Sequence, residues 1–184
     1  MSKGTHDYAA DPRNGDIKIG LNGGLVPRSE AKVSVFDSGF VLGDGVWEGL
    51  RLHSGGLPFL SMHLDRLYEG AKVLDLDIGL TREELTRRIL DVLRANGMRD
   101  HVHIRLMVTR GIKATPHQDP RFVIGPPTIA IVPEYKEPLP ETVKRGIRLF
   151  TVHVRRGAPD VQDPKLNSHS KLNCILACIQ AAKA

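Results

Sequence analysis

The stretch VFDSGFVLGDGVWEGLR, from Val35 to Arg51, decides the fold that we expect for this chain of 184 residues. Its Gly43-Asp44-Gly45 segment indicates a turn, because glycine adopts backbone conformations that other residues avoid. The segment does not fit a dinucleotide-binding fingerprint, since neither the glycine spacing nor a following helix matches that motif. We therefore expect a tight turn that leads directly into a strand.

The residues after this turn, Val46 to His53, predict a strand that ends at a second turn, Ser54-Gly55-Gly56. Successive side chains of a strand point to opposite faces of its sheet. Trp47 and Glu48 should therefore lie on opposite faces, so that only one of them can line a given cavity.

Hydrophobic periodicity on both sides of this stretch predicts alternating strands and helices. Apolar residues spaced by four and three from Leu60 to Leu74 predict an amphipathic helix. Thr81 and Glu84 form a capping-box pattern for a second helix that should end near Gly97, with Leu85, Ile89, Val92 and Leu93 buried. The remaining expected elements are a hairpin at 17–27, strands at 101–110, 128–132 and 147–155, and a helix from about residue 170.

These elements predict an α+β fold made of a small N-terminal α/β domain and an incomplete second domain. We expect a flexible tail at 1–15, the N-terminal domain at 16–136, a proline-containing linker at 137–144 and the start of the C-terminal domain at 145–184. The last expected helix carries an apolar stripe for which the sequence supplies no cover. The second domain is therefore expected to be truncated.

Composition narrows the classes of function. Hydrophobic residues make up 41% of the chain and charged residues 26%, which is typical of folded globular proteins. The net charge of +5 comes from scattered Lys and Arg, and only 5% of residues are aromatic, so a small anionic ligand is favoured over nucleic acid. No apolar stretch predicts a membrane span or a secretory signal, and we expect a cytoplasmic protein. Cys174 and Cys178 are expected to be packed, reduced thiols, and no metal site is indicated.

The stretch from Val35 to Arg51 resembles a segment near the start of branched-chain and D-amino-acid aminotransferases, the fold type IV or class IV enzymes that use pyridoxal 5'-phosphate. Three further segments match in order and spacing: His63-Leu-Asp-Arg66-Leu, Ile104-Arg-Leu and Val108-Thr-Arg-Gly111. The resemblance covers the N-terminal portion of that family. It implies pyridoxal 5'-phosphate as cofactor, small amino acids and keto acids as substrates, and a homodimer for the full-length protein.

The resemblance also assigns roles to individual residues. Arg66 corresponds to the arginine that binds the cofactor phosphate, and a guanidinium fork suits a phosphate because it donates two hydrogen bonds at once. Trp47 and Arg110 are expected near the substrate, although Arg110 could be only the polar end of a strand. His117 is also expected to bind substrate, because it matches the histidine of an Arg-x-His pair that grips the substrate carboxylate in the D-amino-acid enzymes, but Thr115 replaces the arginine of that pair. A D-amino-acid substrate is therefore disfavoured.

The catalytic lysine, which holds the cofactor as a Schiff base in the family, is displaced in this sequence. At the family's spacing from the helix end, counted back from Gln180, its position falls on Asn167 or Leu166. Lys171 is our first candidate, because residues four apart share one helix face. Lys165 is second, since Pro164 stiffens its approach. A chain with no catalytic lysine is the third possibility.

The function expected from these observations is amino-group transfer between a small amino acid and a 2-keto acid. Two alternatives remain open at this point. A lyase such as aminodeoxychorismate lyase has similar residues around the cofactor, and a binding protein could retain the fold without catalysis because the lysine is displaced.

Overall fold

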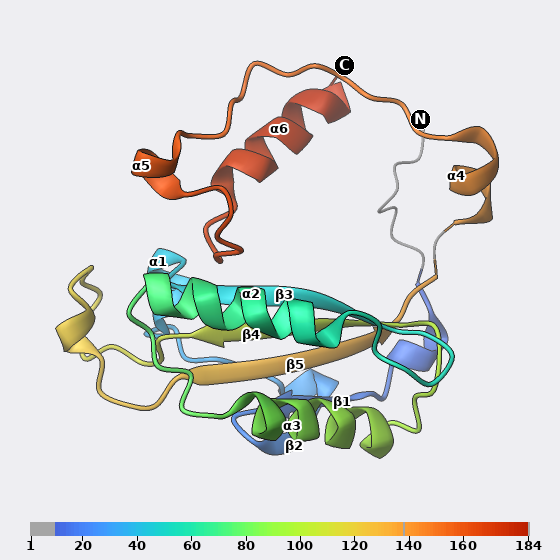
Figure 1. Ribbon diagram of the computed structural model, residues 1–184. Helices are drawn as coiled ribbons and strands as arrows, with labels where there is room; N and C mark the ends of the chain where they lie inside the picture. The colour runs from blue at the N-terminus through green and yellow to red at the C-terminus, as the bar shows by residue number, and fades with distance from the viewer. Residues whose placement is uncertain (1–9, 138, 184) are drawn as a thin grey trace.

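The computed structural model describes residues 10–137 and 139–183, and its central feature is an antiparallel sheet of five strands (Figure 1). The strands follow the order β2-β1-β5-β4-β3, so that β2 and β3 form the two edges. Their bounds are β1 Lys18–Leu21, β2 Gly24–Pro27, β3 Gly45–Leu52, β4 Val102–Thr109 and β5 Thr128–Tyr135. The expected hairpin is confirmed: β1 pairs with β2 around a turn at Asn22 and Gly23, where φ is +50° and +87°.

Two amphipathic helices cover one face of the sheet (Figure 1). Helix α2, Leu60–Val73, packs against β3, and helix α3, Arg82–Ala95, packs against β1 and β5. The capping box is present as predicted: the Thr81 hydroxyl accepts from the Glu84 backbone N–H while the Glu84 carboxylate accepts from the Thr81 backbone N–H. All four α3 residues predicted to be buried are buried, and together with α2 and the sheet they form one hydrophobic core.

The short elements are helices α1 Ser38–Leu42, α4 Pro140–Arg145 and α5 Pro159–Gln162, and the 3-10 turns η1 Pro12–Asn14, η2 Arg28–Glu30 and η3 Pro120–Phe122. Helix α1 lies inside the stretch from Val35 to Arg51, where we expected no helix. Asp37 caps it and Gly43, at φ +70°, ends it. This short helix therefore turns the chain into β3.

The structure describes only the last part of the flexible tail expected at 1–15, and that part is attached to the sheet. Residues 1–9 lie outside the described residues. In the described part, Asn14 donates to the carbonyl of Tyr135 and accepts from its backbone N–H, at 3.0 and 2.8 Å. These paired hydrogen bonds attach residues 12–14 to the end of β5.

The C-terminal segment corrects a second expectation. No strand forms at 147–155. A strand needs a neighbour for its backbone hydrogen bonds, and among the described residues no strand runs beside this segment. Helix α4 begins at Pro140, within the linker expected at 137–144, and the last helix, α6, spans Leu172–Lys183.

Helix α6 stands away from the sheet, and the chain that leads to it passes over the β3 edge (Figure 1). Its expected apolar stripe is exposed at Leu172, Ile175, Leu176 and Ile179. Cys174 and Cys178 are free and exposed, whereas packed thiols were expected. Among the described residues, no helix is both long and apolar enough to cross a membrane.

Candidate active site at the edge of the sheet

The candidate site forms where residues 167–169 lie against the edge strand β3. The Trp47 backbone N–H donates to the Asn167 carbonyl at 2.9 Å, and the His169 backbone N–H donates to the Gly45 carbonyl at 3.0 Å. Val46 and Ser168 form an antiparallel bridge between these bonds. An edge strand presents unpaired backbone groups that another segment can use. The edge of β3 therefore holds the loop that precedes α6.

Glu48 anchors one side of this site from beneath the helix α2. Its carboxylate is completely buried and accepts from Nε and Nη2 of Arg66, both at 2.6 Å, while His63 Nδ1 lies 2.8 Å from it. The hydrogen bonds to Glu48 are the main reason that the pKa of Arg66 is raised above its ordinary value. The Arg66 side chain is 52% exposed, and Nη1 is the nitrogen that this fork does not use. Arg66 thus has a fixed orientation and an accessible charge.

Trp47 occupies the opposite face of β3, as the alternation of side chains predicts, because Glu48 is buried whereas Trp47 is half-buried. Its indole N–H donates to the Ser168 carbonyl at 3.1 Å. The Arg105 guanidinium carbon lies 4.0 Å from the ring centroid, and Lys171 Nζ lies 5.2 Å from it. Trp47 therefore provides a fixed aromatic surface close to two cationic groups.

Lys171 is the lysine that the structure brings to this surface. Its Nζ donates to Asn167 Oδ1 at 3.1 Å. Partial burial lowers the pKa of the Lys171 amine, and the nearby positive charges of Arg156, Arg105 and Arg66 lower it further. Burial is also the main cause of the lowered pKa of His169, whose Nε2 lies 3.2 Å from the Val46 carbonyl. A larger fraction of a lysine with a lowered pKa is neutral near neutral pH, and only the neutral amine can attack a carbonyl or accept a proton.

The other predicted residues lie outside this cluster. Lys165 is exposed, in a turn where its backbone N–H donates to Asp163. Arg110 forms an ion pair with Asp44 at 2.7 Å and donates to the carbonyls of Leu74 and Asp75, so it holds the start of β3 to the end of α2. His117 lies in the loop between β4 and β5.

The His117 ring packs edge-on against Phe122, with centroids 5.0 Å apart, and its Nδ1 accepts from the Asp119 backbone N–H. The structure therefore places Lys171 beside the Trp47 ring, with Arg66 near enough to act on the pKa of Lys171, and it does not bring Arg110 or His117 to them. The substrate-binding roles of Arg110 and His117 stay predictions.

Sequence reasoning gave no role to Glu48, Asn167 or Arg156. A signal for Glu48 was available: His63 and Arg66 are three apart on one helix face, and a carboxylate at an inward position of the preceding strand can meet both. Asn167 and Arg156 carried no such signal, because their positions depend on a loop that crosses the sheet edge.

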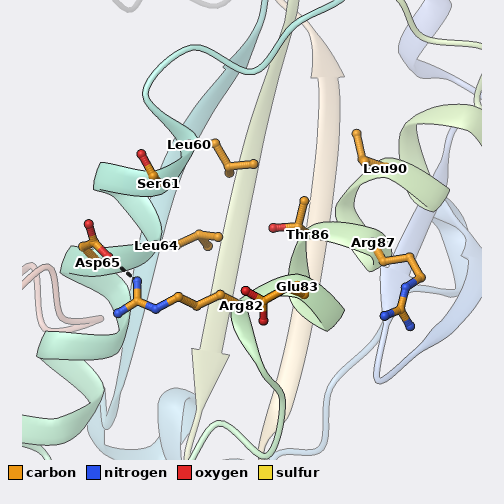
Figure 2. A pocket seen from close by; sticks show the side chains of 9 residues that line it. All are labelled: Leu60, Ser61, Leu64, Asp65, Arg82, Glu83, Thr86, Arg87 and Leu90. Carbon is orange, nitrogen blue, oxygen red and sulfur yellow. Dashed lines mark hydrogen bonds and ion pairs between the residues drawn. The ribbon is translucent and has the colours of Figure 1, made fainter.

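A hollow lies between α2 and α3, and Figure 2 shows its lining. It has a volume of about 460 Å³. Leu60, Leu64 and Leu90 make it apolar, and an ion pair between Arg82 and Asp65 bounds it. Neither Arg66 nor Lys171 belongs to this lining, so the hollow is separate from the site at the β3 edge.

Comparison with known proteins identifies the family of the chain. The family model described as "Amino-transferase class IV" matches residues 45–184, well over half of the chain. A putative branched-chain-amino-acid aminotransferase of Methanocaldococcus jannaschii is 47% identical over 166 residues, which cover 90% of this chain and 56% of the relative. A D-alanine aminotransferase of Staphylococcus haemolyticus is 33% identical over 73% of this chain and 47% of its own length.

Solved structures show the same fold. The branched-chain aminotransferase of the archaeon Thermoproteus uzoniensis, crystallised with norvaline, superposes with a TM-score of 0.77 at 29% identity, covering 92% of this chain and 58% of that one. Another branched-chain amino acid aminotransferase, crystallised with pyridoxamine 5'-phosphate, superposes with a TM-score of 0.80 at 31% identity, covering 92% of this chain and 57% of that one.

The chain thus spans about half the length of the curated relatives that it matches. The family uses pyridoxal 5'-phosphate, as the sequence predicted. The chain belongs to the class IV aminotransferase family and has the fold type IV architecture of its N-terminal portion.

Proposed function

We propose that this chain carries the N-terminal part of a pyridoxal-phosphate-dependent aminotransferase that moves an amino group between a small amino acid and a 2-keto acid. The observation that carries the proposal is the cluster at the β3 edge. There a lysine of lowered pKa lies 5.2 Å from the centroid of an aromatic ring, and the charge of a half-exposed, fixed arginine contributes to lowering that pKa. Branched-chain substrates are proposed because the relatives named above include branched-chain enzymes.

The residues of this cluster fit the cofactor. Arg66 would hold the phosphate, because Glu48 fixes its plane and leaves Nη1 available. Arg105 and Arg156 add positive charge, since both act on Lys171 from nearby. Trp47 would flank the bound group with its ring. When bound, pyridoxal phosphate supplies an aldehyde that reacts with amines and an electron sink for the substrate's α-carbon.

Lys171 would act as the attacking amine and, once released, as the base that moves a proton at the substrate's α-carbon. Both tasks need a neutral amine. The lowered pKa makes a larger fraction of Lys171 neutral at a given pH than an ordinary lysine would have. We further propose that the full-length protein is a cytoplasmic homodimer, as the resemblance implies.

Peptide mapping tests the cofactor site. The protein is incubated with pyridoxal phosphate, reduced with borohydride, digested and analysed by mass spectrometry. We expect the phosphopyridoxyl group on Lys171, its retention in Lys165→Arg and its loss in Lys171→Arg. In Arg66→Lys, the cofactor concentration for half-maximal labelling should rise about tenfold, since the fork to phosphate is lost. Label spread over surface lysines, unchanged in Lys171→Arg, would overturn the assignment.

A second candidate is a cofactor-binding protein without transfer activity. It is favoured by Asn167, which stands at one of the two positions where the family's lysine was expected and hydrogen-bonds to Trp47. Labelling at Lys171 without movement of an amino group from a branched-chain amino acid to a 2-keto acid would support this candidate. Release of a keto acid from a substrate without amino-group uptake would indicate a lyase.

A further inference from the structure

Asn167 makes three contacts that join the C-terminal loop to the site. Its backbone carbonyl accepts from the Trp47 N–H at 2.9 Å, and its side-chain Nδ2 donates to the Trp47 carbonyl at 2.7 Å. Its Oδ1 accepts from Lys171 Nζ at 3.1 Å. One residue therefore engages both backbone groups of Trp47 and the amine of Lys171.

These contacts determine which way the Asn167 amide points. Nδ2 must face the Trp47 carbonyl, because an amide oxygen there would place two acceptors together. Oδ1 then faces Lys171, whose protonated amine has three donors and no acceptor. The hydrogen bond to β3 thus orients the amide, and the hydrogen bond from Lys171 to Oδ1 fixes the position of the amine.

From this geometry we propose that Asn167 is a positioning residue that holds the Lys171 amine beside the Trp47 ring. This inference rests on the proposed function, because positioning the Lys171 amine matters for catalysis only where Lys171 is the catalytic lysine. It also explains how a lysine four residues from Asn167 can serve this site. Residues 167–171 precede α6, which begins at Leu172, and the hydrogen bond to Asn167 Oδ1 holds the Lys171 amine near β3.

A purely structural role for Asn167 is the competing explanation. Its contacts with Trp47 alone would hold the loop on the edge strand and leave the amine unaffected. The two roles differ in the protonation of Lys171, because only a positioning contact places the residue 167 side chain against the amine. The other groups that act on this amine are Arg66 from α2, Arg105 from β4, Arg156 from the preceding loop and Cys174 from α6.

The first experiment measures the protonation of Lys171 without cofactor. The protein is acetylated with acetic anhydride over a range of pH values, and the label on each lysine peptide is quantified by mass spectrometry. In Asn167→Asp, a carboxylate replaces the amide beside the amine. We expect the pKa of Lys171 to rise by about one unit, as for a lysine that gains an adjacent opposite charge.

The matched control is Asn173→Ala on α6. Asn173 donates to the Arg155 carbonyl at 2.8 Å, so this variant also removes one side-chain hydrogen bond that holds the loop. We expect the pKa of Lys171 in this control to equal that of the unmodified protein. If Asn167→Asp shifts Lys171 no more than Asn173→Ala does, the positioning role is overturned.

The second experiment uses the cofactor. Borohydride-fixed pyridoxal phosphate on Lys171 should fall about three- to tenfold in Asn167→Ala, which corresponds to the loss of one hydrogen bond. In Asn167→Asp, labelling of Lys171 should recover at pH values above the raised pKa of Lys171, because the aspartate side chain keeps an oxygen that accepts from the amine. Far-ultraviolet circular dichroism checks that each variant is folded.

The two experiments separate the inference from the proposed function. A shifted Lys171 pKa together with reduced cofactor labelling in Asn167→Ala supports the positioning role. Labelling of Lys171 that neither Asn167 variant alters overturns the positioning role and leaves the proposed function standing. Absence of label on Lys171 in the unmodified protein overturns the proposed function, while the acetylation titration still decides whether Asn167 holds the amine.

Discussion

The buried carboxylate of Glu48 and the half-exposed guanidinium of Arg66 form a two-point ion pair, with both nitrogen–oxygen distances at 2.6 Å. The pair connects the inward face of β3 to the outer side of α2. A charge that lies on an exposed helix is thereby held in one orientation at the edge of the sheet. In the proposed cofactor site, Glu48 would orient Arg66 for its contact with the phosphate.

Glu48→Gln should therefore weaken both stability and cofactor binding. A glutamine can accept only one of the two Arg66 hydrogen bonds and places an NH₂ group against the other nitrogen. The free energy of unfolding should fall by about 1–3 kcal/mol, less than for a fully buried pair because water can solvate Arg66. Urea unfolding measures this change. The cofactor concentration for half-maximal labelling should rise in parallel.

The control for this prediction is Glu69→Gln, which removes one negative charge from the exposed surface of the same helix. Its stability and labelling should remain within error of the unmodified protein. Equal effects of the two substitutions would show that net charge, and not the ion pair, determines cofactor binding.

Arg105→Gln should make Lys171 less reactive at mildly alkaline pH. Arg105 is one of the cations that lower the pKa of Lys171, so its removal should raise that pKa. A higher pKa means a smaller neutral fraction at any pH below it. Acetylation of Lys171 should slow about twofold at pH 8. Arg87→Gln on α3 is the control and should leave the rate unchanged; an unchanged rate in Arg105→Gln would refute the electrostatic explanation.

Gly111→Ala should destabilise the protein. Gly111 has a φ of +104°, and an added Cβ would lie 2.3 Å from the carbonyl oxygen of Pro126. Backbone cannot move aside as a flexible side chain can, so we expect a loss of about 1–3 kcal/mol in the free energy of unfolding from strain. Gly125→Ala, on the same loop, has open space around its added Cβ. It should be nearly neutral, and thermal unfolding compares the two.

The capping box at the start of α3 should make stability depend on pH. The pKa of Glu84 is lowered, chiefly because its carboxylate accepts from the Thr81 backbone N–H. A lowered folded-state pKa stabilises the fold above the unfolded value near 4.5, and the contribution is lost as pH falls through the folded-state pKa. Glu84→Ala should therefore lower the melting temperature at pH 7 more than at pH 3.

The matched substitution is Glu83→Ala, which removes a neighbouring acid from the same helical turn outside the capping box. Its effect on the melting temperature should be smaller at pH 7. A loss in Glu84→Ala that does not change between pH 7 and pH 3 would contradict the role of the ionised carboxylate.

Local sequence patterns were sufficient to predict most elements of the N-terminal domain. Helix α3 shows why, since its capping residues, its buried stripe and its terminating glycine all lie within one short segment. The hairpin of β1 and β2 is similar, because its turn residues accept positive φ. The strand expected at 147–155 failed because strand formation requires a partner that periodicity alone cannot supply.

Some features of the candidate site also follow from local sequence, and others depend on the tertiary structure. The sequence by itself determined the family, the alternation that places Trp47 and Glu48 on opposite faces, and the candidates Arg66 and Lys171. Only the tertiary structure decided that Asn167 meets Trp47 across 120 positions of sequence and that Arg110 is taken up by Asp44. Side-chain periodicity is a property of neighbouring residues, whereas these contacts depend on how distant segments of chain pack against the edge of one sheet.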